Sequence, residues 1–219
     1  MSGVWAVTAC YRPDIGVLRE TLRVMGLPAD RVVVVANNDD PPRQEEIPEA
    51  TVIPAATAEL NLARWWNEGM DYVACRDRGE HDLLVFDADS AVPAAGITRL
   101  SEVLREHGLG AACPDRLGTL PAGSVHIERQ IGPVPWEVRM TGWCFMLRGE
   151  AGLRADPQFR FWYADDDMEC QARLAGGTGM AGGVRGGHPE ASRPLTPYQR
   201  ECADVDAGRF SAKWGFSPA

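Results

Sequence analysis

Short apolar runs alternate with amphipathic stretches through the first half of the chain, and this alternation constrains the fold most strongly. The runs VVVVA (32–36) and DLLVF (82–86) show no polar alternation, which is typical of parallel strands buried on both faces. Elsewhere apolar residues recur at spacings of three and four, as between Ile15 and Met25. Repeated strand–helix units of this length predict an α/β fold with a mostly parallel central sheet flanked by helices.

Local signals set the expected boundaries of these units. Asp14 is a suitable N-cap for the first helix, and Gly108 is a suitable end for a later one. Further strands are expected at 4–8, 51–54 and 110–113, and further helices at 62–76 and from about residue 97 to Gly108.

The second half lacks this regular alternation, because glycine- and proline-rich loops separate its elements. Hairpin-like segments are expected at 125–130 and 138–147, followed by a helix near 165–175. The last helix has a strong start signal, with Thr196 as N-cap, Pro197 at the first position and Gln199 completing a capping box.

Composition narrows the class of protein. A chain of 219 residues with 45% apolar side chains predicts one domain spanning 1–219, with a sizeable core. The six cysteines form no C-x-x-C pair, which favours reduced, buried thiols in a cytoplasmic protein over a zinc site or a disulfide framework. No apolar run reaches the ~18 residues of a membrane span, so integral membrane association is not expected.

Charge is distributed unevenly along the chain. The formal net charge is −9, and residues 1–110 carry ten basic against eighteen acidic side chains, whereas residues 111–219 carry twelve against thirteen. A uniformly basic face for nucleic acid is therefore not expected.

Paired carboxylates follow a predicted strand at Asp87-Ala88-Asp89. Ligands of open α/β sheets bind at the carboxyl ends of the strands, where this motif falls. Residues i and i+2 of a strand point the same way, so both carboxylates are expected to converge on one divalent cation. Oxygen ligands suit Mg²⁺ or Mn²⁺. A D-x-D alone is also compatible with a solvated strand end.

Two further clusters stand later in the chain. Asp165, Asp166 and Asp167 open the predicted fourth helix, where acids complement the helix dipole but three in a row exceed what a cap needs. His188 stands alone in a glycine- and proline-rich loop, either as a structural residue or as a ligand.

These clusters belong to a longer series of motifs in a fixed order. The series comprises Val7 to Pro13, Val34 to Asp39, Asn61 to Gly69, the D-x-D, Gly142 to Arg148, Asp166 to Arg173, His188 with Ser192, and Lys213-Trp214-Gly215. In this combination the chain resembles the inverting family 2 glycosyltransferases of GT-A fold, particularly their short rhamnosyltransferase-like members. Ala36 departs from the family's base-contacting aspartate, and Asp166 from the glutamate of its E-D pair.

The resemblance implies a metal-dependent inverting transfer from a nucleoside-diphosphate sugar to an acceptor hydroxyl. It implies a nucleotide-sugar-binding half (1–110) and an acceptor-binding half (111–219). Asp167, with Asp166, is expected as the catalytic pair, Asp167 taking the acceptor proton. Nucleotide contacts are expected from Thr8, Asn37, Asp39, Asn67 and Asp87, and Mn²⁺ or Mg²⁺ ligands from Asp89, His188 and Asp87. Trp143 and Trp162 either face a sugar or pack in the core.

Two other functions stay open from the sequence. Asp-x-Asp after an apolar strand also opens haloacid-dehalogenase-like phosphohydrolase sites, although that class expects the motif on the first strand. A non-catalytic protein that binds nucleotide or carbohydrate is the second alternative. The acceptor is expected to be a soluble glycan, a protein or a modified DNA base, and the net charge of −9 disfavours a long DNA footprint.

Overall fold

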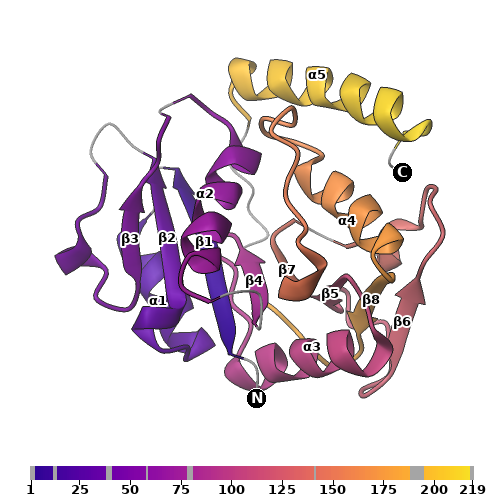
Figure 1. Ribbon diagram of the computed structural model, residues 1–219, viewed down its shortest axis with the longest axis horizontal. Coiled ribbons are helices and arrows are strands. Elements are labelled where there is room, and N and C mark those ends of the chain that lie inside the picture. The colour runs from indigo at the N-terminus through magenta and orange to yellow at the C-terminus, as the bar shows by residue number, and fades with distance from the viewer. Residues whose placement is uncertain are drawn as a thin grey trace.

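The computed structural model of the chain describes residues 3–11, 14–37, 41–57, 59–77, 81–140, 142–187 and 195–217. Within these residues an eight-stranded sheet runs through the molecule in the order β3-β2-β1-β4-β7-β5-β8-β6 (Figure 1). The strands are β1 (Val4–Tyr11), β2 (Val32–Asn37), β3 (Thr51–Pro54), β4 (Asp82–Phe86), β5 (Ala111–Pro114), β6 (Val125–Glu128), β7 (Cys144–Arg148) and β8 (Thr178–Ala181).

The strands of the first half pair in parallel, as their apolar sequences predict. β1 lies between β2 and β4, and β3 completes this side of the sheet. Antiparallel β7 joins β4 to β5, which pairs in parallel with β8, and antiparallel β6 forms the edge. The mostly parallel sheet predicted from the sequence is confirmed.

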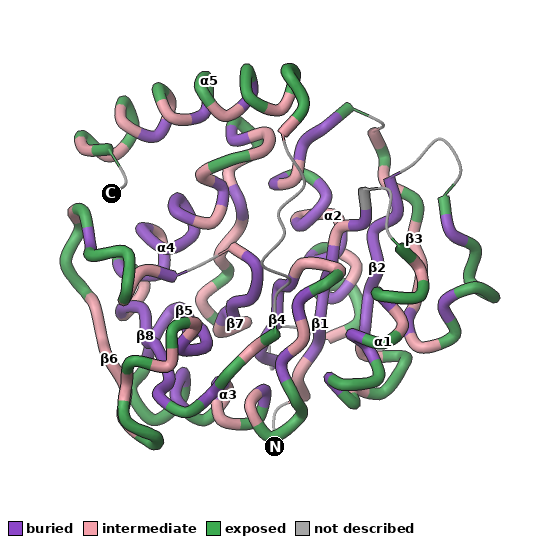
Figure 2. Tube along the Cα trace, turned by 180° about the vertical axis from the view of Figure 1, so that it is seen from behind, coloured by how far each residue is buried: buried purple, intermediate pink, exposed green. Residues whose placement is uncertain are grey.

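Helices cover both faces of the sheet and divide the core in two. The α-helices are α1 (Ile15–Met25), α2 (Leu62–Ala74), α3 (Ala94–His107), α4 (Ala164–Leu174) and α5 (Pro197–Trp214). One cluster packs α1 and α3 against the side chains of Val32 and Val34, and the other packs α2, α4 and Phe210 of α5 against Val33 and Val35. Both faces of β2 are therefore buried, which explains its unbroken apolar sequence (Figure 2).

Several local predictions are confirmed by hydrogen bonds. Asp14 accepts from the backbone of Gly16 and Val17 and caps α1. Thr196 and Gln199 form the predicted capping box of α5. Gly108 ends α3 in the left-handed conformation that favours glycine.

The second half departs from prediction in its strand pairing. The segments 125–130 and 138–147 form no hairpins, because β6 pairs with β8 and β7 is inserted between β4 and β5. β8 was not predicted, because Thr-Gly-Met-Ala lacks both polar alternation and β-branched residues beyond Thr178. The second predicted helix ends at Ala74, two residues short of the predicted Arg76.

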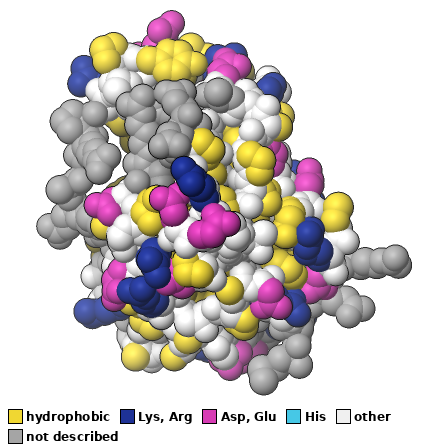
Figure 3. All heavy atoms as spheres, turned by 90° about the vertical axis from the view of Figure 1, so that its left-hand side faces the viewer, with side chains coloured by type: hydrophobic (Ala, Val, Ile, Leu, Met, Phe, Trp, Pro, Cys, Tyr) yellow, Lys and Arg dark blue, Asp and Glu magenta, His cyan; other side chains and the backbone are white. Residues whose placement is uncertain are grey.

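The predicted reduced thiols are confirmed, and their predicted burial is confirmed for all but one of them. All six cysteines are free and five are buried, but Cys75 at the end of α2 is exposed. No helix in the described part of the chain is both long and apolar enough to cross a lipid bilayer. Basic and acidic side chains are intermixed on the molecular face shown in Figure 3.

Candidate active site

A cavity of about 430 Å³ opens at the carboxyl edge of the sheet. Val7 of β1 pairs with Val85 of β4, so the residues that follow each strand reach the same edge. β7 runs in the opposite direction and begins there, because Cys144 pairs with Phe86. The lining is largely aromatic and comprises Ala9, Leu60, Leu62, Trp65, Trp66, Asp87, Arg116, Trp136, Arg139, Gly142, Trp143, Phe161, Trp162, Asp165 and Gln199.

The D-x-D motif lies in a turn and not on a strand. β4 ends at Phe86, and the N–H of Ser90 donates to the carbonyl of Asp87 at 2.9 Å. The rule that residues i and i+2 face the same way therefore does not apply here. The N–H of Asp87 donates to the carbonyl of Trp143 at 2.8 Å, which fixes Asp87 at the cavity wall. Asp89 is exposed.

Electrostatics at this turn favour a cation. Burial, followed by the negative charges of Asp89 and Asp165, raises the pKa of Asp87 to about 7. A divalent cation would relieve this repulsion, and carboxylate oxygens suit Mg²⁺ or Mn²⁺. The carboxylates of Asp87 and Asp89 are therefore chemically suited to the predicted cation.

A third metal ligand is not found in the described part of the chain. No group of three or more His, Cys, Asp or Glu side chains there is arranged to hold a metal. The predicted ligand His188 lies outside the described residues. Gly187, to which it is bonded, exchanges both backbone hydrogen bonds with Ala91, two residues after Asp89. The chain thus reaches residue 187 beside the D-x-D turn.

The three consecutive aspartates of α4 face three directions. Successive side chains on a helix are rotated by about 100°, so only one of the three aspartates can point directly into the cavity. That residue is Asp165, which lines the cavity and packs against Gly142, where an added Cβ would lie 2.7 Å from Oδ2 of Asp165. Burial raises the pKa of Asp165, although Arg139 and nearby backbone N–H groups oppose the shift. A carboxylate with a raised pKa is a stronger base.

The backbone before Asp165 is strained. Tyr163, the residue that precedes α4, has φ of 63°, a left-handed conformation that is rare for a bulky residue. Its ring packs against Phe210 of α5, with centroids 5.8 Å apart. Packing from α5 therefore holds the turn that presents Asp165 to the cavity.

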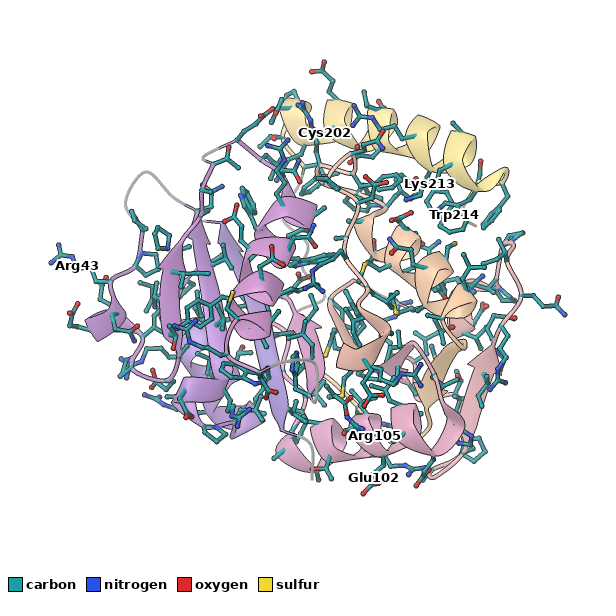
Figure 4. The ribbon with its side chains drawn as sticks, viewed as in Figure 1. Arg43, Glu102, Arg105, Cys202, Lys213 and Trp214 are labelled. Carbon is teal, nitrogen blue, oxygen red and sulfur yellow. The ribbon has the colours of Figure 1, made fainter. Side chains whose placement is uncertain are left out.

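Asp166 and Asp167 are not among the residues that line the cavity. Asp166 is buried and pairs with Arg139, Nε to Oδ1, at 3.1 Å, and burial together with Asp165 raises its pKa to about 8. The carboxylate of Asp167 is wholly buried and accepts from three side chains: Gln171 at 2.7 Å, Lys213 at 2.8 Å and Trp214 at 2.8 Å. Lys213 and Trp214 lie in the last turn of α5, above α4 (Figure 4). Asp167 thus joins α4 to α5.

The predicted nucleotide contacts are only partly gathered at the cavity. Thr8 is buried one residue before the lining residue Ala9, and its hydroxyl has no partner among the described residues. Asn37 is buried and donates to the carbonyl of Thr57 at 2.9 Å.

Two further predicted contacts stand apart from Thr8 and Asn37. The side-chain amide of Asn67 donates to the carbonyl of Ala155 and accepts from its N–H, which joins α2 to the loop before α4. Asp39 lies outside the described residues.

Most of the aromatic wall was not predicted. Trp143 and Trp162, noted in the sequence, both line the cavity, Trp143 nearly buried and Trp162 42% exposed. Trp65, Trp66, Trp136 and Phe161 join them. Trp65 and Trp66 lie in the helix that was predicted at 62–76, but no local signal in the sequence placed Trp136 or Phe161 at the site.

A carboxylate of α5 shapes the loop that carries Phe161 and Trp162. Asp206 is wholly buried, and its Oδ2 accepts from three consecutive backbone N–H groups, those of residues 160–162, at 2.9, 2.9 and 3.1 Å. Its Oδ1 accepts from Arg209 at 3.2 Å. No pattern in the sequence indicates this role, because a lone aspartate in the middle of a helix usually faces solvent.

Comparison with known proteins supports the fold independently of these residues. No protein-family model and no curated protein sequence matches the chain. Among solved structures, S. aureus TarS 1-349 is similar with a TM-score of 0.61 and 11% identity over 98% of this chain and 72% of TarS 1-349. GalNAc-T7, solved with UDP, GalNAc and Mn²⁺, gives a TM-score of 0.62 and 14% identity over 86% of this chain and 44% of GalNAc-T7.

TarS 1-349 has also been solved with UDP-GlcNAc, and this complex gives a TM-score of 0.56 at 13% identity. Identities this low show a shared fold and nothing more. The chain therefore has the α/β fold of the GT-A glycosyltransferases, as the sequence predicts.

Proposed function

We propose that the chain is a metal-dependent inverting glycosyltransferase that moves a sugar from a nucleoside-diphosphate sugar to an acceptor hydroxyl. The proposal rests on one observation: Asp87, beyond the end of β4, and Asp165, in the first turn of α4, line the same aromatic cavity. Structures of similar fold support it, since TarS has been solved with UDP and UDP-GlcNAc, and GalNAc-T7 with UDP and Mn²⁺.

The donor is assigned to the D-x-D side of the cavity. Asp87 and Asp89 would hold Mn²⁺ or Mg²⁺, with His188 as the proposed third ligand. When bound, the cation would supply positive charge to the departing diphosphate. Thr8, Asn37 and Asp39 remain the proposed nucleotide contacts. Asn67 is not retained among them, because its amide donates to and accepts from the backbone of Ala155 and does not line the cavity.

Asp165 is the proposed base, in place of the predicted Asp167. Its carboxylate accepts the proton of the acceptor hydroxyl while the hydroxyl oxygen bonds to the anomeric carbon. The bond from that carbon to the diphosphate oxygen breaks, and its electron pair leaves with the diphosphate. A single displacement of this kind inverts the anomeric configuration.

A donor screen tests the proposal. UDP-, GDP-, TDP- and CMP-sugars are incubated with the protein and Mn²⁺ or Mg²⁺, and release of the nucleotide is measured. One nucleotide sugar should be consumed, EDTA should abolish turnover, and added cation should restore it. Full turnover in EDTA would contradict the metal assignment.

The two alternative functions predict different results, and each has its own measurement. A non-catalytic binder would bind a nucleotide sugar by calorimetry without turning it over. A phosphohydrolase would release inorganic phosphate from p-nitrophenyl phosphate and would lose this activity on Asp87→Asn while keeping it on Asp165→Asn.

A further inference from the structure

Two arginines share one exposed indole at the cavity wall. The guanidinium carbon of Arg116 lies 3.7 Å from the ring centroid of Trp136, and that of Arg139 lies 5.3 Å from the same ring. All three side chains line the cavity. Arg116 directly follows Asp115, at the carboxyl end of β5, so the sheet fixes its backbone at the same edge as Asp87. Stacking on an aromatic ring orients a guanidinium while leaving its N–H groups available.

The positive charges of the two arginines are not equally compensated. Arg139 forms its ion pair with Asp166 at 3.1 Å. Arg116 has no carboxylate within ion-pair distance among the described residues, although it is half-buried. Burial and the charge of Arg139 both lower the pKa of Arg116. A partly desolvated cation without a counter-charge is costly, and a bound anion would remove that cost.

The position of Arg116 favours the acceptor over the donor as the source of this anion. The donor diphosphate is assigned to Asp87 and Asp89, which follow β4. Arg116, Trp136 and Arg139 come from the segments after β5 and before β7. They are linked to the proposed base, because Arg139 pairs with Asp166, the neighbour of Asp165.

We infer that Arg116, stacked on Trp136, binds a phosphate or carboxylate group of the acceptor, so that the enzyme glycosylates a hydroxyl compound that carries a negative charge. The assignment of the anion to the acceptor rests on the proposed function, but anion binding at Arg116 does not depend on turnover. A planar guanidinium can hold either group through two N–H donors. Neutral glycans then lack the interaction that places their hydroxyl at Asp165.

Binding of small probes tests the site directly. Tryptophan fluorescence is followed while sn-glycerol 3-phosphate, glycerate or glycerol is added, because Trp136 lies against Arg116. Both anions should change the fluorescence and glycerol should not, and added salt should weaken the binding. Arg116→Gln should weaken anion binding at least tenfold, whereas Arg116→Lys should retain part of it because the charge remains.

Arg76→Gln is the matched control, since Arg76 also stacks on an aromatic ring, Tyr72 at 3.4 Å, but is exposed and does not line the cavity. It should bind the anions as the wild type does. Equal binding by wild type and Arg116→Gln would overturn the inference. Circular dichroism confirms that each variant is folded, and Arg116→Lys provides a second variant if Arg116→Gln is not.

A competition experiment separates acceptor from donor. With saturating UDP and Mn²⁺ present, glycerol 3-phosphate should still bind with unchanged affinity. Displacement by UDP would overturn the inference and assign Arg116 to the donor diphosphate. If UDP with Mn²⁺ fails to bind at all, the proposed function fails, while titration without nucleotide still decides whether Arg116 binds anions.

Discussion

The two halves of the molecule are held together by different kinds of interaction. In the parallel half, β1, β2 and β4 are fixed by apolar side chains packed on both faces. Among the described residues before position 110, one acid, Asp82, is wholly inaccessible to solvent. The later half contains five buried acids, which accept hydrogen bonds or form ion pairs: Asp115, Asp166, Asp167, Glu169 and Asp206. Apolar layers build the first half, whereas buried carboxylates fix the loops of the second.

This difference changes how an acidic residue should be interpreted. Asp82 lies at the amino end of β4, away from the cavity, and pairs with Arg105 at 3.0 Å. Figure 4 shows Arg105 rising from α3 toward the sheet while Glu102 points away from it. In the second half, buried acids lie on α4 and α5, which each also contribute a lining residue to the cavity, and one of these acids, Asp167, was predicted as the base. Acidity alone therefore does not distinguish a reacting carboxylate from one that holds the structure.

The largest expected effect compares Asp165 with Asp167. Asp165→Asn should reduce transfer by roughly 10²–10⁴-fold, the usual contribution of a positioned proton acceptor, with little change in stability. Asp167→Asn should leave most of the transfer activity but lower the free energy of unfolding by about 2–3 kcal/mol, because Lys213 and Trp214 lose a charged acceptor. Initial rates at saturating donor and urea unfolding of both variants give the result. The opposite pattern would return the role of base to Asp167.

The next effect compares the two buried acids Asp206 and Asp82. Each pairs with one arginine, but Asp206 also accepts from three backbone N–H groups of the cavity loop. Both Asp→Asn changes should lower the free energy of unfolding by about 3 kcal/mol. Asp206→Asn alone should also speed hydrogen exchange at residues 160–162 and raise the acceptor KM. If Asp82→Asn changes KM equally, the loop is not specifically controlled by Asp206.

Sequence reasoning succeeded where local chemistry decides the structure. The burial of VVVVA, the cap at Asp14 and the capping box at Thr196 each depend on neighbouring residues, and all are confirmed. It failed where contacts between distant segments decide. The insertion of β7 between β4 and β5 and the partners of Asp206 are set by residues tens of positions away.

The same distinction applies within the candidate site. The D-x-D was found because it directly follows a recognisable strand, and Asp87 does line the cavity. The direction that each of three adjacent aspartates faces depends on how α4 is rotated, which packing against α5 fixes. Arg116 and Trp136 stand twenty residues apart, and no periodic pattern links them.

Two neighbouring glycines, Gly186 and Gly187, lie where the second half of the chain contacts the D-x-D turn of the first half, and they test whether packing there affects donor binding. An added Cβ at Gly186 would overlap the ring of Trp143, whose carbonyl holds Asp87, whereas at Gly187 it would meet nothing within 4 Å. Gly186→Ala should lower the free energy of unfolding by about 1–3 kcal/mol and weaken metal-dependent donor binding. Gly187→Ala should be neutral or slightly stabilising. Thermal unfolding measures the stability of each variant, and calorimetric titration with UDP and Mn²⁺ measures its affinity for the nucleotide. Equal affinity in the two variants would mean that the position of Trp143 does not affect metal binding at Asp87 and Asp89.

The smallest expected effect compares one helix cap from each half. Asp14 caps α1 and Thr196 caps α5, so replacing either by Ala should cost about 1 kcal/mol of stability. The functional consequences should differ. α1 packs on the face of the sheet that carries Val32 and Val34 and contributes no residue to the cavity, whereas Gln199, the hydrogen-bond partner of Thr196, lines the cavity. Asp14→Ala should leave kcat and KM unchanged, and Thr196→Ala should raise the acceptor KM a few-fold at equal loss of stability. Both variants lose the same kind of cap. If the acceptor KM rises equally in both at equal loss of stability, the cavity responds to the overall stability of the fold and not to the position of α5.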